Sequence, residues 1–259
     1  MTTLQFSANL GFLWQDQTLP QAIHSAKAAG FDAVECHWPY AFPAQDVQDA
    51  LQKTGLRMLG LNTHRGNVAA GDNGLAAMPG REAQARAAID EAIDYAIKIN
   101  TPNIHVMAGF ATGKAARQTF IANLQYACER ASPFGITILI EPLNHYDAPG
   151  YVLTTSRQAE EIIEAASAHG TTNNLRLMFD CYHIQLMEGD LSHRLRTLMP
   201  IIGHIQFASV PDRGPPGNGE ICYAYIFDLV RELGYSQPLG AEYKPVGDTA
   251  QTLGWMLEH

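Results

Sequence analysis

The chain has 259 residues, and its 26 acidic and 17 basic side chains give a formal net charge of −9 at pH 7. With 46% hydrophobic and 17% charged residues, it has the composition of a soluble globular protein large enough to build a full core, which excludes disordered and fibrous proteins. Because no run of Lys or Arg accompanies the negative charge, we expect no binding to nucleic acid or to an anionic membrane surface.

The N-terminus and the cysteines favour a cytoplasmic protein. Residues 1–5 lack the pattern of a secretory signal, and no stretch approaches the ~18 apolar residues of a membrane-spanning helix. Four widely spaced cysteines predict neither a disulfide framework nor a zinc knuckle; they are Cys36, Cys128, Cys181 and Cys222. Residues 257–259 resemble the remnant of a histidine tag, so the expected domain spans residues 1–256. A homo-oligomer is compatible with the sequence.

Short apolar segments alternate with longer helical patterns along the chain. Eight strands are expected, at Gln5–Asn9, Ala33–Glu35, Leu56–Asn62, Asn103–Met107, Ile136–Glu141, Leu175–Asp180, Gly203–Phe207 and Leu239–Glu242. Helices are expected between them, at Leu19–Ala29, Ala44–Lys53, Arg81–Ile99, Lys114–Ala131, Ser156–Ala166 and Tyr223–Leu233. This alternation predicts an α/β fold with a parallel sheet. Eight units of about 32 residues match a single-domain (β/α)8 TIM barrel better than a doubly wound open sheet.

The last four predicted strands end in oxygen-bearing side chains, at the end of the barrel where the chemistry of such folds occurs. These residues are Glu141, Asp180, Gln206 and Glu242. Period-two alternation gives them one face of their strands, and if that face points inward the three carboxylates share a pocket. Carboxylates so close would repel one another unless a cation lay between them. Hard oxygen ligands without a thiolate favour Mg²⁺ or Mn²⁺.

Other polar residues are candidates for contacts around this pocket. His183 follows Asp180 by three positions, so in a helical turn both would face the same side. Arg213 and Lys244 follow the last two strands, and either could hold a substrate carboxylate. Glu35 ends the second strand and is a candidate for a supporting contact. Each of these residues is also compatible with an ordinary structural role.

The chain resembles the hydroxypyruvate isomerase family of the xylose isomerase-like barrels from Phe6 to Trp255. The most specific segments are residues 78–82, 140–151, 180–189, 203–206, 217–221 and 242–245. The resemblance implies an aldose–ketose isomerase with metal ligands at Glu141, Asp180, Gln206 and Glu242. It also implies that Glu141 and Glu242 transfer the proton and that His183 and Arg213 contact substrate. Many members of the wider superfamily carry His where Gln206 stands, so the expected metal field here is all oxygen.

The activity implied by the resemblance is the interconversion of hydroxypyruvate and 2-hydroxy-3-oxopropanoate (tartronate semialdehyde) through an enediolate. Residues 141–151 favour this substrate, whereas residues 211–213 also match isomerases of the four-carbon 2-oxo-tetronates, which are the second reading. A ketose 3-epimerase and a non-catalytic barrel that binds sugar acids are further alternatives. Endonuclease-like members of the superfamily use more histidine ligands and a basic DNA-binding face, neither of which the sequence shows.

Overall fold

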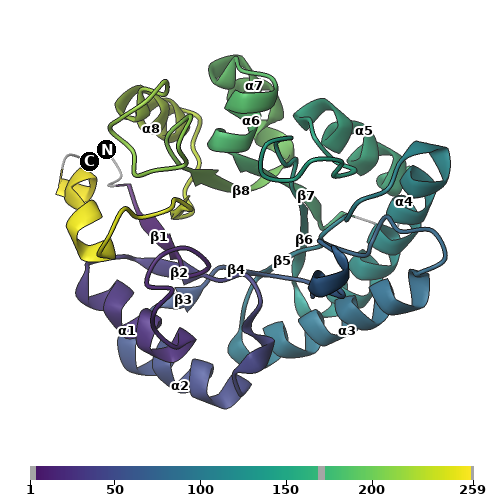
Figure 1. Cartoon of the computed structure of the whole chain (residues 1–259), viewed down its shortest axis with the longest axis horizontal. Helices are drawn as coiled ribbons and strands as arrows, with labels where there is room; N and C mark the ends of the chain where they lie inside the picture. The colour runs from purple at the N-terminus through teal and green to yellow at the C-terminus, as the bar shows by residue number, and fades with distance from the viewer. Residues whose placement is uncertain (1–3, 169–172, 258–259) are drawn as a thin grey trace.

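The computed structural model describes residues 4–168 and 173–257, so Glu258 and His259 of the expected tag remnant lie outside the described residues. Within these residues, nine parallel strands form one sheet in the order β3-β2-β1-β9-β8-β7-β6-β5-β4. The helices surround this sheet as an outer ring (Figure 1). The single-domain TIM barrel predicted from the sequence is confirmed.

The strands are short and buried on both faces. They are β1 (Phe6–Asn9), β2 (Ala33–Glu35), β3 (Arg57–Met58), β4 (Gly60–Asn62), β5 (Asn103–His105), β6 (Thr137–Ile140), β7 (Leu175–Asp180), β8 (Ile202–Phe207) and β9 (Leu239–Ala241). In β1, Phe6 and Ala8 alternate with Ser7 and Asn9, and all four are buried. The apolar pair faces the helices and the polar pair faces the barrel interior, as expected for a strand covered on both sides.

The third predicted strand, Leu56–Asn62, is interrupted at Leu59, which lies between β3 and β4. β3 pairs with β2, whereas β4 pairs with β5. Hydrogen bonds from Leu59 N to Val34 O (2.7 Å) and from Cys36 N to Gly60 O (3.1 Å) keep β2 bound on both sides of the interruption. β3 and β4 therefore together fill the place of one strand between β2 and β5, and the barrel has eight such strand positions.

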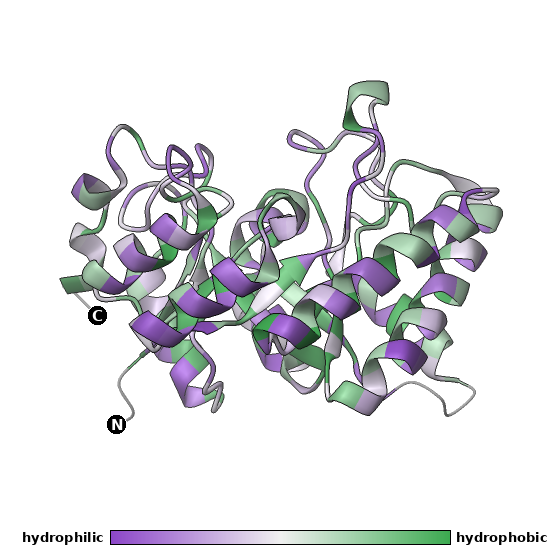
Figure 2. Ribbon diagram, turned by 90° about the horizontal axis from the view of Figure 1, so that it is seen from below, coloured by the Kyte–Doolittle hydropathy of each residue, from purple (hydrophilic) through white to green (hydrophobic). Residues whose placement is uncertain are grey.

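Eight α-helices cover the outside of the barrel in the described part of the chain. They are α1 (Leu19–Ala28), α2 (Ala44–Thr54), α3 (Glu82–Ile99), α4 (Gly113–Ala131), α5 (Ser156–Ser167), α6 (Cys181–Met187), α7 (Leu191–Leu198) and α8 (Tyr223–Glu232). Hydrophilic residues lie on their outer faces (Figure 2). The sequence patterns did not predict α6 and α7. No described helix is long and apolar enough to cross a membrane.

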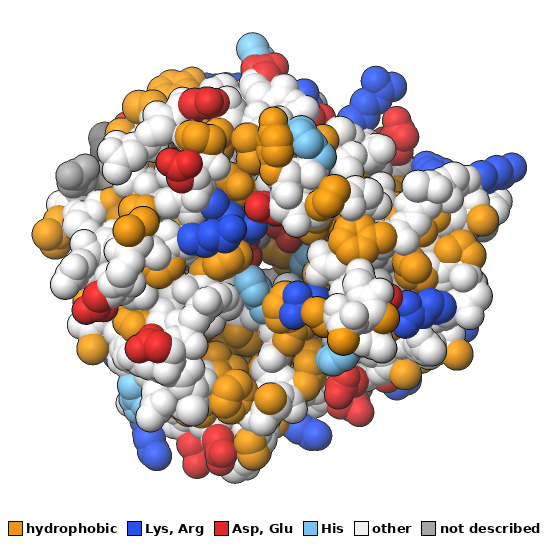
Figure 3. All heavy atoms as spheres, viewed as in Figure 1, with side chains coloured by type: hydrophobic (Ala, Val, Ile, Leu, Met, Phe, Trp, Pro, Cys, Tyr) orange, Lys and Arg blue, Asp and Glu red, His pale blue; other side chains and the backbone are white. Residues whose placement is uncertain are grey.

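The carboxyl ends of the strands open on one face of the molecule. Figure 3 shows a hollow at the centre of this face, with His, acidic and basic side chains around it. α6 begins at the edge of this hollow without an intervening loop, because the Asp180 side chain accepts a hydrogen bond from Tyr182 N at 2.9 Å and caps the helix. The last residue of β7 is thereby fixed at the barrel mouth.

Candidate active site

Three carboxylates and one imidazole meet at the carboxyl end of the barrel. Glu141 follows β6, Asp180 ends β7, Glu242 follows β9, and His183 lies in the first turn of α6. One ligand atom of each lies within 4.8 Å of the others, and all four residues are buried. The structure thus brings together the three carboxylates and the histidine that the sequence predicted to share a pocket.

Gln206, the fourth predicted metal ligand, joins this group from β8. It stands in register with Asp180 of the neighbouring strand β7. Its Nε2 donates to Glu35 Oε1 at 2.8 Å and to Glu242 Oε1 at 3.3 Å. Its Oε1 is buried and has no hydrogen-bond partner among the described residues. The amide nitrogen is thereby engaged, and the oxygen remains available as a ligand.

Glu242 is surrounded by donors. Its Oε1 accepts from Asn9 Nδ2 at 2.8 Å and lies 3.1 Å from His37 Nε2, and its Oε2 accepts from Arg213 Nη2 at 2.5 Å. Burial raises the pKa of Glu242, but the Arg213 guanidinium and then the hydrogen bond from His37 outweigh burial and hold the pKa well below its usual range. Glu242 is therefore ionised at neutral pH.

Glu141 and Asp180 have the opposite shift. Burial, followed by the charge of Glu242, raises the pKa of Glu141 well above its usual range and that of Asp180 to about 8. Glu141 Oε1 and Asp180 Oδ2 are buried without hydrogen-bond partners among the described residues. Two carboxylates with raised pKa values thus lie beside one with a lowered pKa, an arrangement typical of sites that transfer protons or bind cations.

The unpartnered oxygens of Glu141, Asp180 and Gln206 test whether these residues suit a metal ion. A buried oxygen that accepts no hydrogen bond has lost its hydrogen bonds to water and has gained none in the protein, which is unfavourable. A hard divalent cation would satisfy all three oxygens and would offset the repulsion between the carboxylates. The residues present therefore fit a divalent cation, and their oxygens are the donor type that Mg²⁺ and Mn²⁺ prefer.

His183 is oriented by the loop after β6. Its Nδ1 accepts a hydrogen bond from Asn144 N at 3.1 Å and lies 2.7 Å from Asn144 Nδ2. Burial and then the charge of Arg213 lower the pKa of His183 to about 3, so the ring is neutral. With Nδ1 accepting, the proton lies on Nε2, which is 3.6 Å from Asp180 Oδ2. This tautomer makes His183 a hydrogen-bond donor toward the pocket, which suits substrate binding better than metal ligation.

Arg213 is the cation inside this cluster. Its Nη1 donates to Asp147 Oδ2 at 3.1 Å, and its Nη2 lies 3.8 Å from Asp180 Oδ2 in addition to its bond with Glu242. The guanidinium carbon lies 4.6 Å from the ring centroid of Phe12. A planar cation held between carboxylates and an aromatic face is well placed to exchange one of its partners for a substrate carboxylate.

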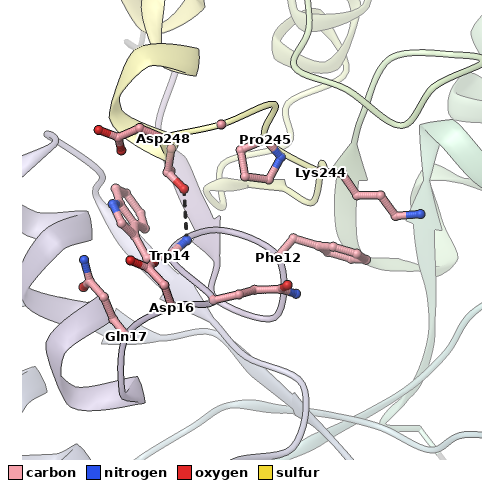
Figure 4. A pocket seen from close by; sticks show the side chains of 10 residues that line it. Phe12, Trp14, Asp16, Gln17, Lys244, Pro245 and Asp248 are labelled. Carbon is pink, nitrogen blue, oxygen red and sulfur yellow. Dashed lines mark hydrogen bonds between the residues drawn. The ribbon is translucent and has the colours of Figure 1, made fainter.

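Lys244 lies at the rim rather than within the cluster. Its backbone N–H donates to Arg213 O at 2.7 Å, which helps to fix the arginine. Its side chain is exposed, and no carboxylate of the described residues lies within ion-pair distance of its ammonium group. Figure 4 shows this side chain lining a cavity of about 450 Å³ together with Phe12, Trp14 and Asp248. Phe12 thus lines the cavity and also contacts the Arg213 guanidinium.

The prediction from sequence missed several polar residues of the site. Asn9 and His37 contact Glu242, as described above, and Asp147 binds Arg213. His105, at the end of β5, is buried with Nδ1 3.5 Å from Glu141 Oε2, and neither ring nitrogen has a hydrogen-bond partner among the described residues. Asn9 ends the predicted first strand, so the signal that identified the acidic residues also marks it, whereas His105 ends β5 two residues before the predicted end at Met107. The supporting contact expected of Glu35 is present, since its carboxylate binds the Gln206 amide.

A family model described as "Xylose isomerase-like TIM barrel" matches residues 23–259. The chain belongs to the xylose isomerase-like TIM barrel family. Among proteins of this kind, it is 40% identical to the 2-oxo-tetronate isomerase of Cupriavidus necator, covering 97% of each chain. It is 39% identical to the putative hydroxypyruvate isomerase of Mus musculus, covering 100% of this chain and 96% of that one.

A solved structure of the same architecture is that of a protein from Brucella melitensis named AP endonuclease, family 2. It superposes on this barrel with a TM-score of 0.95 at 35% sequence identity, covering 99% of each chain. The names of the relatives at this level of identity thus include two isomerases and one endonuclease.

Proposed function

We propose that this protein is a metal-dependent aldose–ketose isomerase that interconverts hydroxypyruvate and 2-hydroxy-3-oxopropanoate. The observation that carries the proposal is the buried pair Glu141 and Glu242, two carboxylates of one cluster whose pKa values are shifted in opposite directions. An isomerisation of this type needs one group that accepts a proton from carbon and another that returns one. Isomerases of hydroxypyruvate and of 2-oxo-tetronate among the relatives support the same chemistry.

Binding of the substrate depends on Arg213 and His183 in this proposal. The substrate carboxylate pairs with the Arg213 guanidinium, and the proton on His183 Nε2 hydrogen-bonds a substrate oxygen. Glu141 Oε1, Asp180 Oδ2, Gln206 Oε1 and Glu242 are the atoms and groups proposed to hold a divalent cation, Mg²⁺ or Mn²⁺. When bound, that cation supplies positive charge where the substrate oxygens become negative.

Proton transfer is assigned to the two glutamates. Ionised Glu242 accepts a proton from C3 of hydroxypyruvate, which leaves an enediolate across C2 and C3. Glu141 donates a proton to C2 while the hydroxyl proton of O3 passes to O2, so that C3 becomes the aldehyde. Exchange with water restores both glutamates, and the reverse reaction uses them in the opposite roles. Acid–base groups of this kind typically contribute about 10²- to 10⁴-fold to the rate.

The test is an NMR assay of the purified protein with hydroxypyruvate, after removal of metal with EDTA and after addition of Mg²⁺ or Mn²⁺. Conversion that stops with EDTA and returns with metal is the expected result. Glu141→Gln and Glu242→Gln should each abolish it, whereas Asp90→Asn, a change in a surface ion pair with Arg130, serves as the matched control. Near-normal turnover in either glutamine variant would refute the two-carboxylate mechanism.

The second candidate is a 2-oxo-tetronate isomerase, favoured by the 40% identical relative that carries this name. The same assay with a 2-oxo-tetronate separates the two, since conversion of the four-carbon acid alone would keep the chemistry and change the substrate. An assay for cleavage of DNA at an abasic site tests whether this protein has the activity for which the Brucella protein is named. The net charge of −9 argues against that activity, because DNA backbones bind to basic surfaces.

The proposal extends to the cell compartment and the partners. We infer a cytoplasmic enzyme because all four cysteines are free thiols, which is typical of a reducing compartment. Its proposed partner is a small hydroxy or keto acid, with no nucleic acid and no membrane. Light scattering on the purified protein tests the homo-oligomer that the sequence leaves open.

A further inference from the structure

Gln206 differs from the carboxylates of the cluster because its amide has two unlike ends. A half turn about the last side-chain bond exchanges Oε1 and Nε2. Only the oxygen attracts a cation, since the nitrogen carries two protons and donates them. A carboxylate needs no such control because both of its ends are oxygens. A glutamine in this position therefore needs neighbours that fix which end faces the pocket.

The neighbours that fix this amide are two carboxylates. Gln206 Nε2 is 2.8 Å from Glu35 Oε1 and 3.3 Å from Glu242 Oε1, so Glu35 is the nearer acceptor. In the flipped orientation, the amide oxygen would face these two carboxylate oxygens and be repelled by both. Gln206 Oε1 is consequently left on the other side, buried and without a partner among the residues that the structure describes.

Glu35 is itself held on both of its oxygens. His204 Nε2 lies 2.6 Å from Glu35 Oε2, and Asn9 Nδ2 donates to Glu35 Oε1 at 2.9 Å. Gly240 of β9 leaves room for the pair, since an added Cβ there would lie 2.7 Å from Glu35 Oε1 and 2.8 Å from Gln206 Cγ. A buried carboxylate with this many fixed donors can adopt few other positions.

We propose that Glu35 is a positioning residue that holds the Gln206 amide with Oε1 presented to the divalent cation. This inference rests on the proposed function, because that function supplies the cation. Glu35 acts through Gln206 and not on the substrate. Residues that orient metal ligands in this way typically contribute about 10- to 100-fold to metal affinity.

The experiment measures the affinity of the full chain for Mn²⁺ by calorimetry or EPR, after treatment with a chelator and without substrate. Glu35→Leu removes both acceptors at similar volume and should lower the affinity about 10- to 100-fold. Glu35→Gln is the matched control, because it keeps one oxygen as an acceptor for the Gln206 amide and places its own NH₂ group at the position of Glu35 Oε2, beside His204 Nε2. Its affinity should stay close to that of the wild type, which a general loss of packing or charge would not produce.

A double-mutant cycle tests whether Glu35 acts through Gln206. Gln206→Leu should lower Mn²⁺ affinity, and adding Glu35→Leu to it should cause no further loss. If Glu35→Leu does not fold, Gly240→Ala replaces it, with the β4 variant Gly60→Ala as control because its Cβ would meet nothing closer than 3.8 Å. Gly240→Ala should weaken Mn²⁺ binding and Gly60→Ala should not.

Three results would overturn the proposal. They are wild-type affinity in Glu35→Leu, additive losses in the double variant, and a wild-type protein that binds no Mn²⁺. Failure of the proposed function has a different signature, namely normal Mn²⁺ binding without conversion of either keto acid. The Mn²⁺ titrations then still decide the role of Glu35.

Discussion

Glu141→Gln and Glu242→Gln are expected to have the same effect on turnover and opposite effects on stability. Both variants lose a group proposed to transfer a proton. Their surroundings differ, however, because Glu242 accepts hydrogen bonds on both oxygens, whereas Glu141 Oε1 has no partner among the described residues. Replacing a carboxylate by an amide changes one oxygen into a donor, which is harmful only where donors already surround it.

The magnitudes follow from these contacts in the metal-free protein. In Glu242→Gln, the new NH₂ group faces either Arg213 or the donors of Asn9 and His37, and the buried guanidinium loses the nearest of its charged partners. Breaking a buried ion pair from one side costs about 3 to 5 kcal/mol. A carboxyl with a lowered pKa in the folded protein stabilises it above the unfolded pKa, so this loss applies at pH 7.

Glu141→Gln relieves a repulsion instead. The pKa of Glu141 is raised on folding, first by burial and then by Glu242, so its ionisation opposes folding as the pH rises above the unfolded value. Removing that charge should stabilise the metal-free protein by about 0.5 to 2 kcal/mol, as is common when an active-site residue is replaced. The gain should disappear as the pH falls toward about 4.3, the ordinary pKa of a glutamate.

Urea denaturation of the EDTA-treated wild type and both variants at pH 7 and pH 4 measures these differences. The expected order of unfolding free energy at pH 7 is Glu141→Gln, wild type, Glu242→Gln. If Glu141→Gln is destabilised as strongly as Glu242→Gln, it is wrong to describe the Glu141 carboxylate as repelled by its neighbours and the Glu242 carboxylate as stabilised by them.

Three further outcomes are expected. Gly219→Ala should cost about 1 to 3 kcal/mol more than Gly217→Ala in urea denaturation, because a Cβ at Gly219 would overlap the carbonyl oxygen of Val210, whereas no atom of the described residues lies within 4 Å of one at Gly217. Mn²⁺ at 100 times its Kd should raise the unfolding free energy of the wild type by about 2.7 kcal/mol, and that of Asp180→Asn by less at the same concentration, as calorimetry would measure. Exposed Cys222 should react rapidly with a thiol reagent, while the other three thiols react only after urea unfolds the protein.

The barrel was predictable because strands covered on both faces read as short apolar runs between helical patterns. Two details were not. The predicted strand Leu56–Asn62 breaks at Leu59 because its two halves pair with different neighbours, which depends on how the closed sheet is staggered. α6 gave no separate signal because Asp180 both ends β7 and caps the helix, so the switch from strand to helix takes no residue of its own.

The acidic group was predictable because each member ends a strand predicted from the sequence, but its hydrogen-bonding partners were not. Asn9 and Glu242 are separated by 233 residues, and they meet because barrel closure places β1 beside β9. Glu35 of β2 reaches Gln206 of β8 across the barrel interior by the same closure. Sequence patterns indicate at which end of a strand a side chain lies. Which other side chains it contacts depends on the register of all eight strand positions in the barrel.

Arg213 shows how this difference bears on function. Alone in the sequence, an arginine in a loop is expected to be solvated, and the three carboxylates with a divalent cation would carry a net charge of −1. In the structure, the guanidinium is buried against Glu242 and Asp147 and near Asp180, so one fixed positive charge lies among these carboxylates. A pocket that contains this guanidinium admits an anionic substrate at a lower electrostatic cost than a pocket lined by the carboxylates and the cation alone. This balance favours a keto acid over an uncharged ketose as the substrate, and it depends on a residue whose burial only the folded chain reveals.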